Sequence, residues 1–295
     1  MEVPVVAGRR RGPLGRTLTV VRLVHPFPSL LDAAVVAVVA LVAGGPPDRA
    51  AVLGLATASV QFSIGTLNDV VDAHDDAATR TGKPIPEGLV SEGVAKAMAA
   101  SFGLVGLVLA ASAGPVLLVV AGIGLAIGLW YDLGAAGTRW SWLPLALGVP
   151  LLPVFGWYGA TASLPASFAV LVPAAALAGS ALAIANAAVD VERDVSVGST
   201  SLAVALGPRA AGALVLLLEI LVGALAVGSA SGEGRAGPWL GATAATAAIP
   251  VAGALLGVLR ARSGPGPREA AFELQAVGLG LLAVAWVNAL NAAAA

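Results

Sequence analysis

Acidic and amide side chains recur at the same spacing in two segments of the chain. Residues 68–76 read Asn-Asp-Val-Val-Asp-Ala-His-Asp-Asp, and residues 186–194 read Asn-Ala-Ala-Val-Asp-Val-Glu-Arg-Asp. Both contain the pattern Asn-x3-Asp-x3-Asp, and Asn68 lies 118 residues before its counterpart Asn186. A pattern repeated at one offset predicts two related halves of one fold.

Such a concentration of carboxylates predicts a bound cation. Carboxylates one helical turn apart repel each other, and their proton affinities rise unless positive charge lies between them. Oxygen ligands without histidine or thiolate select a hard ion, and Mg²⁺ typically takes one or two carboxylates while substrate phosphates complete its shell. The two motifs therefore predict a site for Mg²⁺ and a phosphate-bearing ligand.

Basic residues near the motifs fit a phosphate ligand; they are Arg22, Arg80, Lys83, Arg139 and Arg193. If each motif is a continuous helix, 100° of rotation per residue puts its Asn and Asp residues on one face. Gln61 and Thr57 extend the first of these faces into the preceding apolar run. His74 and Glu192 point away from the acids, so we expect a surface residue and a non-ligand, respectively. His25 is expected at the membrane interface.

The segments that carry the motifs are long and apolar. Hydrophobic residues make up 58% of the 295-residue chain and charged residues only 11%, far outside the range of soluble proteins. About 20 apolar residues of helix cross a membrane, and lipid excludes unpaired backbone. The sequence therefore predicts an all-α integral membrane bundle whose nine transmembrane helices lie at residues 29–45, 50–67, 92–111, 113–130, 142–161, 167–189, 208–229, 237–259 and 270–290.

These spans predict a single membrane domain. We expect a cytoplasmic N-terminal segment at 1–28, a transmembrane domain at 29–290 and a C-terminal tail at 291–295. The two halves of the domain would be residues 29–130 and 142–259, with the ninth helix as an addition. Glycines four residues apart, such as Gly124 and Gly128, are typical of closely packed membrane helices.

The basic residues predict the orientation, because cytoplasmic loops retain Lys and Arg. With the N-terminus inside, only Arg49 and Arg235 of the 16 basic residues fall outside. This predicts a multi-pass protein of the plasma membrane, with both motifs on the cytoplasmic side and the C-terminus outside. A cleaved signal peptide is the alternative for the basic start, but Asp32 and eight further spans argue against it.

Composition excludes several other functions. The chain has no cysteine and two histidines, which rules out thiolate-bound zinc, iron–sulfur clusters, disulfides and a cysteine nucleophile. A net charge of −1 lacks the broad basic surface that nucleic acids require, so we expect no nucleic-acid partner.

The motifs resemble those of the UbiA-type intramembrane prenyltransferases, whose signatures are Asn-Asp-x2-Asp-x3-Asp and Asp-x3-Asp. The similarity extends to Arg-Thr-Gly-Lys-Pro-Ile-Pro-Glu-Gly at 80–88, Tyr-Asp-Leu at 131–133, Trp-Ser-Trp-Leu-Pro at 140–144 and Gly-Ser-Thr-Ser-Leu at 198–202. It covers most of the chain. The resemblance implies nine helices around a central cavity, two Mg²⁺ ions that hold a prenyl diphosphate, and a prenyl tail that lies toward the lipid.

The resemblance also implies a role for individual residues. Members ionise the carbon–oxygen bond of an allylic diphosphate, and an electron-rich acceptor captures the cation. The Mg²⁺ ligands, directly or through water, would be Asp69, Asp72, Asp76, Asp190 and Asp194. Catalytic roles would fall to Asn68, Asp72, Asp190, Arg22, Lys83, Arg139 and Tyr131, and binding of the metal-bound diphosphate to Asn186, Arg80 and Arg193. The rings of Phe62, Trp130 and Tyr131 would face the cation, unless they are interfacial anchors.

Two departures from the family pattern concern cations. Relatives often have a Lys soon after the Tyr of span four, where this chain has Ala135 and Ala136, and a basic residue where it has Ser199.

The leading function is transfer of an isoprenyl group to an aromatic acceptor within the membrane. One rival is a terpene cyclase with the same Mg²⁺ site, in which the tail's own double bond captures the cation. A more distant rival is a divalent-cation carrier, although the acids gather at one membrane face.

Three further acids lie inside predicted spans. Asp32 could pair with Arg22, and Glu273, beside Arg268, would extend its head group to the interface. Glu219 lies near the bilayer middle, where an ionised group costs at least ~3 kcal/mol unless it is paired or faces a wet cavity. It is therefore either a cavity or acceptor-binding residue, or a protonated structural group.

Overall fold

The computed structural model describes residues 13–79, 82–231 and 237–294, and these ranges contain helices and no strand. The helices are α1 (Pro13–Val21), η1 (Arg22–Val24), α2 (Pro26–Val42), α3 (Pro47–Val71), α4 (Ala73–Thr79), α5 (Glu92–Ala113), α6 (Pro115–Trp130), η2 (Tyr131–Ala135), α7 (Leu143–Gly148), α8 (Leu151–Thr161), α9 (Phe168–Val189), α10 (Val191–Ser196), α11 (Leu202–Leu206), α12 (Pro208–Ser231), α13 (Gly237–Leu259) and α14 (Pro265–Ala294).

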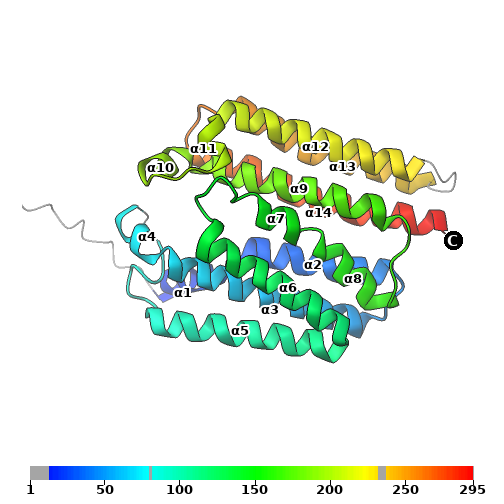
Figure 1. Ribbon diagram of the computed structural model, residues 1–295, viewed down its shortest axis with the longest axis horizontal. Helices are drawn as coiled ribbons and strands as arrows, with labels where there is room; N and C mark the ends of the chain where they lie inside the picture. The colour runs from blue at the N-terminus through cyan, green and yellow to red at the C-terminus, as the bar shows by residue number, and fades with distance from the viewer. Residues whose placement is uncertain (1–12, 80–81, 232–236, 295) are drawn as a thin grey trace, which may run out of the picture.

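The long helices form one bundle, with the short helices α1, α4 and α10 at the same end (Figure 1). In the described ranges, eight spans are long and apolar enough to cross a membrane, and the bent pair Thr17–Val24 and Pro26–Val42 makes a ninth. The predicted all-α membrane bundle of nine spans is therefore confirmed. Helix ends differ from the predicted ones by at most five residues.

The first span is broken rather than straight. Its two parts meet at an angle of 50°, and the joint is His25, whose φ of 47° lies in the left-handed region. Pro26 begins α2, where its missing N–H costs no helical hydrogen bond. The break places the His25 ring beside the acids of the first motif instead of simply at the interface.

The fifth predicted span consists of α7 and α8, which are separated at Val149 and Pro150. Pro150 cannot donate the backbone hydrogen bond that a continuous helix needs.

Helix α9 packs closely on α7, since a Cβ on Gly179 would overlap the Leu145 carbonyl. Close packing also holds at Gly128, where a Cβ would overlap Ile64, but not at Gly124, whose nearest neighbour would be 3.8 Å away.

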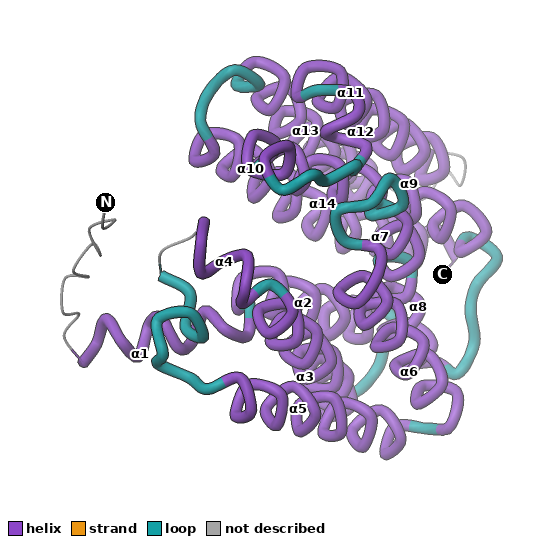
Figure 2. Tube along the Cα trace, turned by 60° about the vertical axis from the view of Figure 1, so that its left-hand side comes forward, coloured by secondary structure: helices purple, strands orange, loops and turns teal. Residues whose placement is uncertain are grey.

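The helices that carry the acids are interrupted at equivalent positions, which corrects the expected continuous helix. Helix α3 ends at Val71 and α4 begins after Asp72, while α9 ends at Val189 and α10 begins after Asp190. The backbone bond from Asp76 N to Asp72 O still forms, at 2.8 Å. Figure 2 shows α4 and α10 at the same end of the bundle, one on each side. The interruptions therefore bring the acids of the two motifs together at that end.

Candidate active site

The first acid motif surrounds the ammonium group of Lys83. Lys83 Nζ lies 2.5 Å from Asp69 Oδ1 and 3.3 Å from Asp76 Oδ2, and both aspartates are buried. The loop that carries Lys83 is held by Glu87, whose Oε1 accepts a bond of 2.6 Å from Gly82 N. His25 Nε2 approaches Asp69 Oδ1 at 3.0 Å, a partner that the sequence did not indicate.

The second motif reaches the first through Arg193. Its Nη1 lies 3.4 Å from Asp76 Oδ1, across 117 residues of chain, and its Nη2 lies 3.6 Å from Asp194 Oδ1. The two motifs thus meet in one charged cluster. Asp72 and Asp190, at the helix interruptions, are half-buried, whereas Asn186 is exposed.

A further acid joins this cluster from α6 and η2. Asn68 Nδ2 donates to Asp132 Oδ1 at 3.1 Å, and Asp132 is 5% exposed. Its Oδ2 has no hydrogen-bond partner among the described residues. Sequence reasoning missed this residue, although it follows Tyr131 in a stretch that carries the family resemblance. This hydrogen bond from Asn68 to Asp132 fixes the orientation of the Asn68 amide group.

Two of the predicted cations, Arg22 and Arg139, make no hydrogen bond or ion pair with the acids among the described residues. Arg22 and Arg139 are exposed, and the Arg139 guanidinium lies 5.4 Å from the Trp140 ring centroid. Arg80 lies outside the described residues. The involvement of these three arginines stays a prediction.

Glu192 points away from the cluster, as expected, and pairs with Arg268 on α14 through both carboxylate oxygens. This hydrogen bond holds the pKa of the Glu192 carboxyl below its usual range. Arg268 is therefore paired with Glu192 and not with Glu273, which is exposed. His74 is exposed on α4, so its surface position is confirmed.

The donor chemistry of the cluster fits a hard cation. In the described ranges, no group of three His, Asp or Glu side chains is already arranged around a metal position. The acids of both motifs nevertheless supply carboxylate oxygens alone, the donor type that Mg²⁺ prefers. Lys83 and Arg193 already place positive charge beside Asp69, Asp76 and Asp194.

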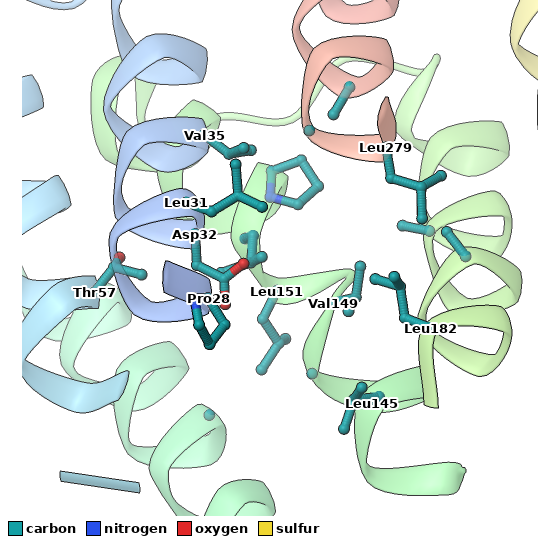
Figure 3. A pocket seen from close by; sticks show the side chains of 18 of the residues that line it. Pro28, Leu31, Asp32, Val35, Thr57, Leu145, Val149, Leu151, Leu182 and Leu279 are labelled. Carbon is teal, nitrogen blue, oxygen red and sulfur yellow. The ribbon is translucent and has the colours of Figure 1, made fainter. Parts of the chain in front are cut away.

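An apolar cavity of about 380 Å³ extends from Tyr131 into the bundle. Its walls come from both halves and include several turns of α14, from Phe272 to Trp286. Figure 3 shows Asp32 among leucine, valine and proline side chains that line it. Asp32 Oδ2 accepts a hydrogen bond from Gln61 Nε2, which corrects the expected pairing with Arg22.

Of the three aromatic residues expected to face a cation, only Tyr131 lines this cavity. Phe62 packs edge-on against Phe102, with ring centroids 5.4 Å apart, and Trp130 is 41% exposed. Glu219 is fully buried but does not line the cavity, and its oxygens have no hydrogen-bond partner in the described chain. This placement favours the structural role for Glu219.

Helices that span a membrane, paired acid motifs at one end and an apolar cavity beneath them define an intramembrane protein that can hold a charged head group next to a hydrocarbon tail. A model of the UbiA prenyltransferase family matches residues 31–272, and the chain belongs to this family. A comparison with curated protein sequences gives no match.

Solved structures show the same fold. The apo structure of a UbiA homologue from Aeropyrum pernix K1 has a TM-score of 0.69 and 21% identity, over 87% of this chain and 96% of the other. A UbiA homologue from Archaeoglobus fulgidus bound to DMAPP and Mg²⁺ has a TM-score of 0.68 and 18% identity, over 90% and 99%. A structure of digeranylgeranylglyceryl phosphate synthase has a TM-score of 0.67 and 15% identity, over 96% and 99%.

Proposed function

We propose that this protein transfers an isoprenyl group from an isoprenyl diphosphate to an acceptor within the membrane, with Mg²⁺ as cofactor and an aromatic acceptor as the leading option. The observation that carries the proposal is the meeting of both acid motifs near Tyr131, a residue that also lines the apolar cavity. Similar folds have been solved with DMAPP and with GPP, each together with Mg²⁺, which supports this substrate class.

The acids of the two motifs would hold Mg²⁺ with the diphosphate. The candidate ligands are Asp69, Asp72, Asp76, Asp190 and Asp194. Bound there, Mg²⁺ supplies charge stabilisation for the departing diphosphate. Asn68, fixed by Asp132, and Asn186, in the last turn of α9, are placed to orient the diphosphate or its metals.

Lys83 and Arg193 are the described cations closest to the acids, and we assign them to the diphosphate oxygens. Arg193, together with Arg139, would take over the work of the basic residues that relatives often have at the positions of Ala135, Ala136 and Ser199. Arg22, Arg80 and Arg139 are further candidates for this role.

The cavity would keep water from the reacting carbon. The residues that line it between Leu145 and Trp286 in the sequence are all apolar. An allylic cation formed below the acids would therefore meet hydrocarbon and the Tyr131 ring rather than solvent. We place the site at the cytoplasmic side of the plasma membrane, where the basic residues predict the motif end to be.

The test is diphosphate release by the full chain in liposomes supplied with dimethylallyl or geranyl diphosphate. We expect release that requires Mg²⁺, stops on chelation and rises with a pool of aromatic acceptors, which become prenylated. Cyclic hydrocarbons formed without acceptor would show the cyclase instead. Mg²⁺ flux without diphosphate consumption would show the carrier.

A further inference from the structure

One carboxylate faces the interior of a cavity whose lining is mostly apolar. Asp32 points into it near Pro28 and Leu151 (Figure 3). The hydrogen bond from Gln61 to Oδ2 is its only polar contact within the described part of the chain. The second carboxylate oxygen, Oδ1, is therefore available to a molecule in the cavity.

The Asp32–Gln61 pair lies deeper in the bundle than the acid motifs. His25, before α2, contacts Asp69 near the end of α3, and Asp32 contacts Gln61 seven or eight residues further along both helices. At 1.5 Å per residue this separation is about 10 Å. A diphosphate at the motifs occupies the first part of that distance, so the allylic carbon and the acceptor lie between the motifs and the pair.

An isoprenyl tail cannot use this carboxylate. Hydrocarbon neither donates nor accepts hydrogen bonds, and a carboxylate left against it without a partner costs free energy. A hydroxyl group that donates to Oδ1 removes this cost and makes a charge-assisted hydrogen bond. Of the two substrates, only the acceptor can carry such a hydroxyl.

We propose that Asp32, oriented by Gln61, binds a hydroxyl group of the acceptor. This inference rests on the proposed isoprenyl transfer and narrows its acceptor to a hydroxyl-bearing compound. Asp32 is then a substrate-binding residue that sets the distance between the acceptor and the allylic carbon. It is separate from the residues assigned to the diphosphate.

The experiment compares two probes that differ by one hydroxyl group. Binding of 1-naphthol and of naphthalene to the full chain in detergent is measured by titration calorimetry, for wild type, Asp32→Leu and Gln61→Leu. A hydrogen bond to a charged group changes affinity by about ten- to a hundredfold. We expect wild type to prefer 1-naphthol by at least about tenfold, and Asp32→Leu to bind both probes alike, while Gln61→Leu shows a reduced preference.

Thr57→Val is the matched control. Thr57 also lines the cavity, but its hydroxyl donates to Leu53 O in its own helix, at 3.0 Å. This variant should keep the wild-type preference. Stabilisation by Mg²⁺ with dimethylallyl diphosphate is measured for every variant, and an unchanged effect shows that the fold and the diphosphate site are intact.

The two proposals fail in different ways. A wild type that binds both probes equally, or a preference that survives in Asp32→Leu, would overturn the hydroxyl site and leave isoprenyl transfer standing. A preference that Asp32→Leu removes, in a protein that never consumes a diphosphate with Mg²⁺, would support the hydroxyl site and overturn the proposed function.

Discussion

Two basic side chains lie among the acids of the site. Lys83 contacts Asp69 and Asp76, and Arg193 reaches Asp76 from the other half of the chain. Buried carboxylates this close repel one another unless positive charge compensates. Lys83 and Arg193 therefore stabilise the folded protein, and the same two cations are available to a diphosphate.

Lys83→Gln should expose the repulsion that Lys83 offsets. Removing one partner of a largely buried ion pair costs about 3 kcal/mol, so the thermal midpoint without metal should fall. Mg²⁺ should then raise the midpoint by more than in wild type, because it supplies the missing charge. Thermal unfolding in detergent, with and without Mg²⁺, measures both effects.

Lys96→Gln is the control for this prediction. Lys96 pairs with Glu92 at 2.6 Å on an exposed helix surface, where an ion pair contributes at most about 1 kcal/mol. Its midpoint should barely change. An equal Mg²⁺ effect in the two variants would show that Lys83 does not compensate the acids.

Asp72→Asn and Asp190→Asn should each lower Mg²⁺-dependent turnover at least a hundredfold, about 3 kcal/mol of transition-state stabilisation. Both changes keep the size of the side chain and remove one formal charge. Initial rates at matched membrane abundance are the measurement. Near-normal activity in both variants would show that these acids are not part of the active site.

His74→Ala and Glu192→Gln provide the comparison. Neither side chain reaches the cluster, so turnover per folded molecule should stay within a few-fold of wild type. Glu192→Gln leaves the buried guanidinium of Arg268 without its anionic partner, and its stability should fall even though its rate does not. A large rate loss in His74→Ala would show that α4 contributes a second face to the site.

The residue types of the site could be predicted from spacing, but several partners could not. The acids repeat at a fixed spacing within each motif, and local spacing is visible in a sequence. The contacts of His25 with Asp69, of Asn68 with Asp132 and of Gln61 with Asp32 join different helices. They depend on how the helices cross, which no local pattern encodes.

At the scale of helices, the spans follow from apolar length, whereas their interruptions follow from tertiary packing. Lipid allows only helices here, so nine apolar runs predict nine spans with good accuracy. The breaks at Asp72 and Asp190 occur where no proline stands. Each break turns a short helix across the end of the bundle, where its acids approach the other half.

Gly179→Ala should weaken the packing of α9 on α7. A Cβ at this position overlaps the backbone of Leu145, which cannot move as a flexible side chain can, so we expect a loss of about 1–3 kcal/mol. Gly122→Ala is the control, since a Cβ there meets nothing within 4 Å and alanine favours helix. Equal stabilities of the two variants would contradict the close approach.

At the scale of the whole molecule, the site lies where the two predicted halves of the chain meet. The interruptions at Asp72 and Asp190 are 118 residues apart, the same offset as the acid motifs. Arg193 of the second half contacts Asp76 of the first, and α14 adds a wall of the cavity. This supports the predicted repeat, in which each half supplies one set of carboxylates and neither half holds the site alone.

The whole-molecule prediction concerns the side of the membrane on which this site lies. Arg49, predicted to be outside, lies in the first turn of α3, at the end opposite to Asn68, and donates to the carbonyls of Gly159 and Ala113. Because the chain has no cysteine, single cysteines can report the orientation. We choose Asp48→Cys at that end and Arg262→Cys at the motif end, since both positions are exposed.

In intact cells, an impermeant thiol reagent should label Asp48→Cys and should label Arg262→Cys only after lysis. The physical reason is the retention of Lys and Arg on the cytoplasmic side, which places the motif end inside. Helix α3 separates Asp48 from Asn68 by about 30 Å, at 1.5 Å per residue, enough to span the hydrocarbon. Labelling of Arg262→Cys in intact cells, with Asp48→Cys protected, would show that the orientation is the reverse of the predicted one. The diphosphate would then have to be supplied from outside the cell, and the proposed cytoplasmic site would be wrong even if the chemistry is right.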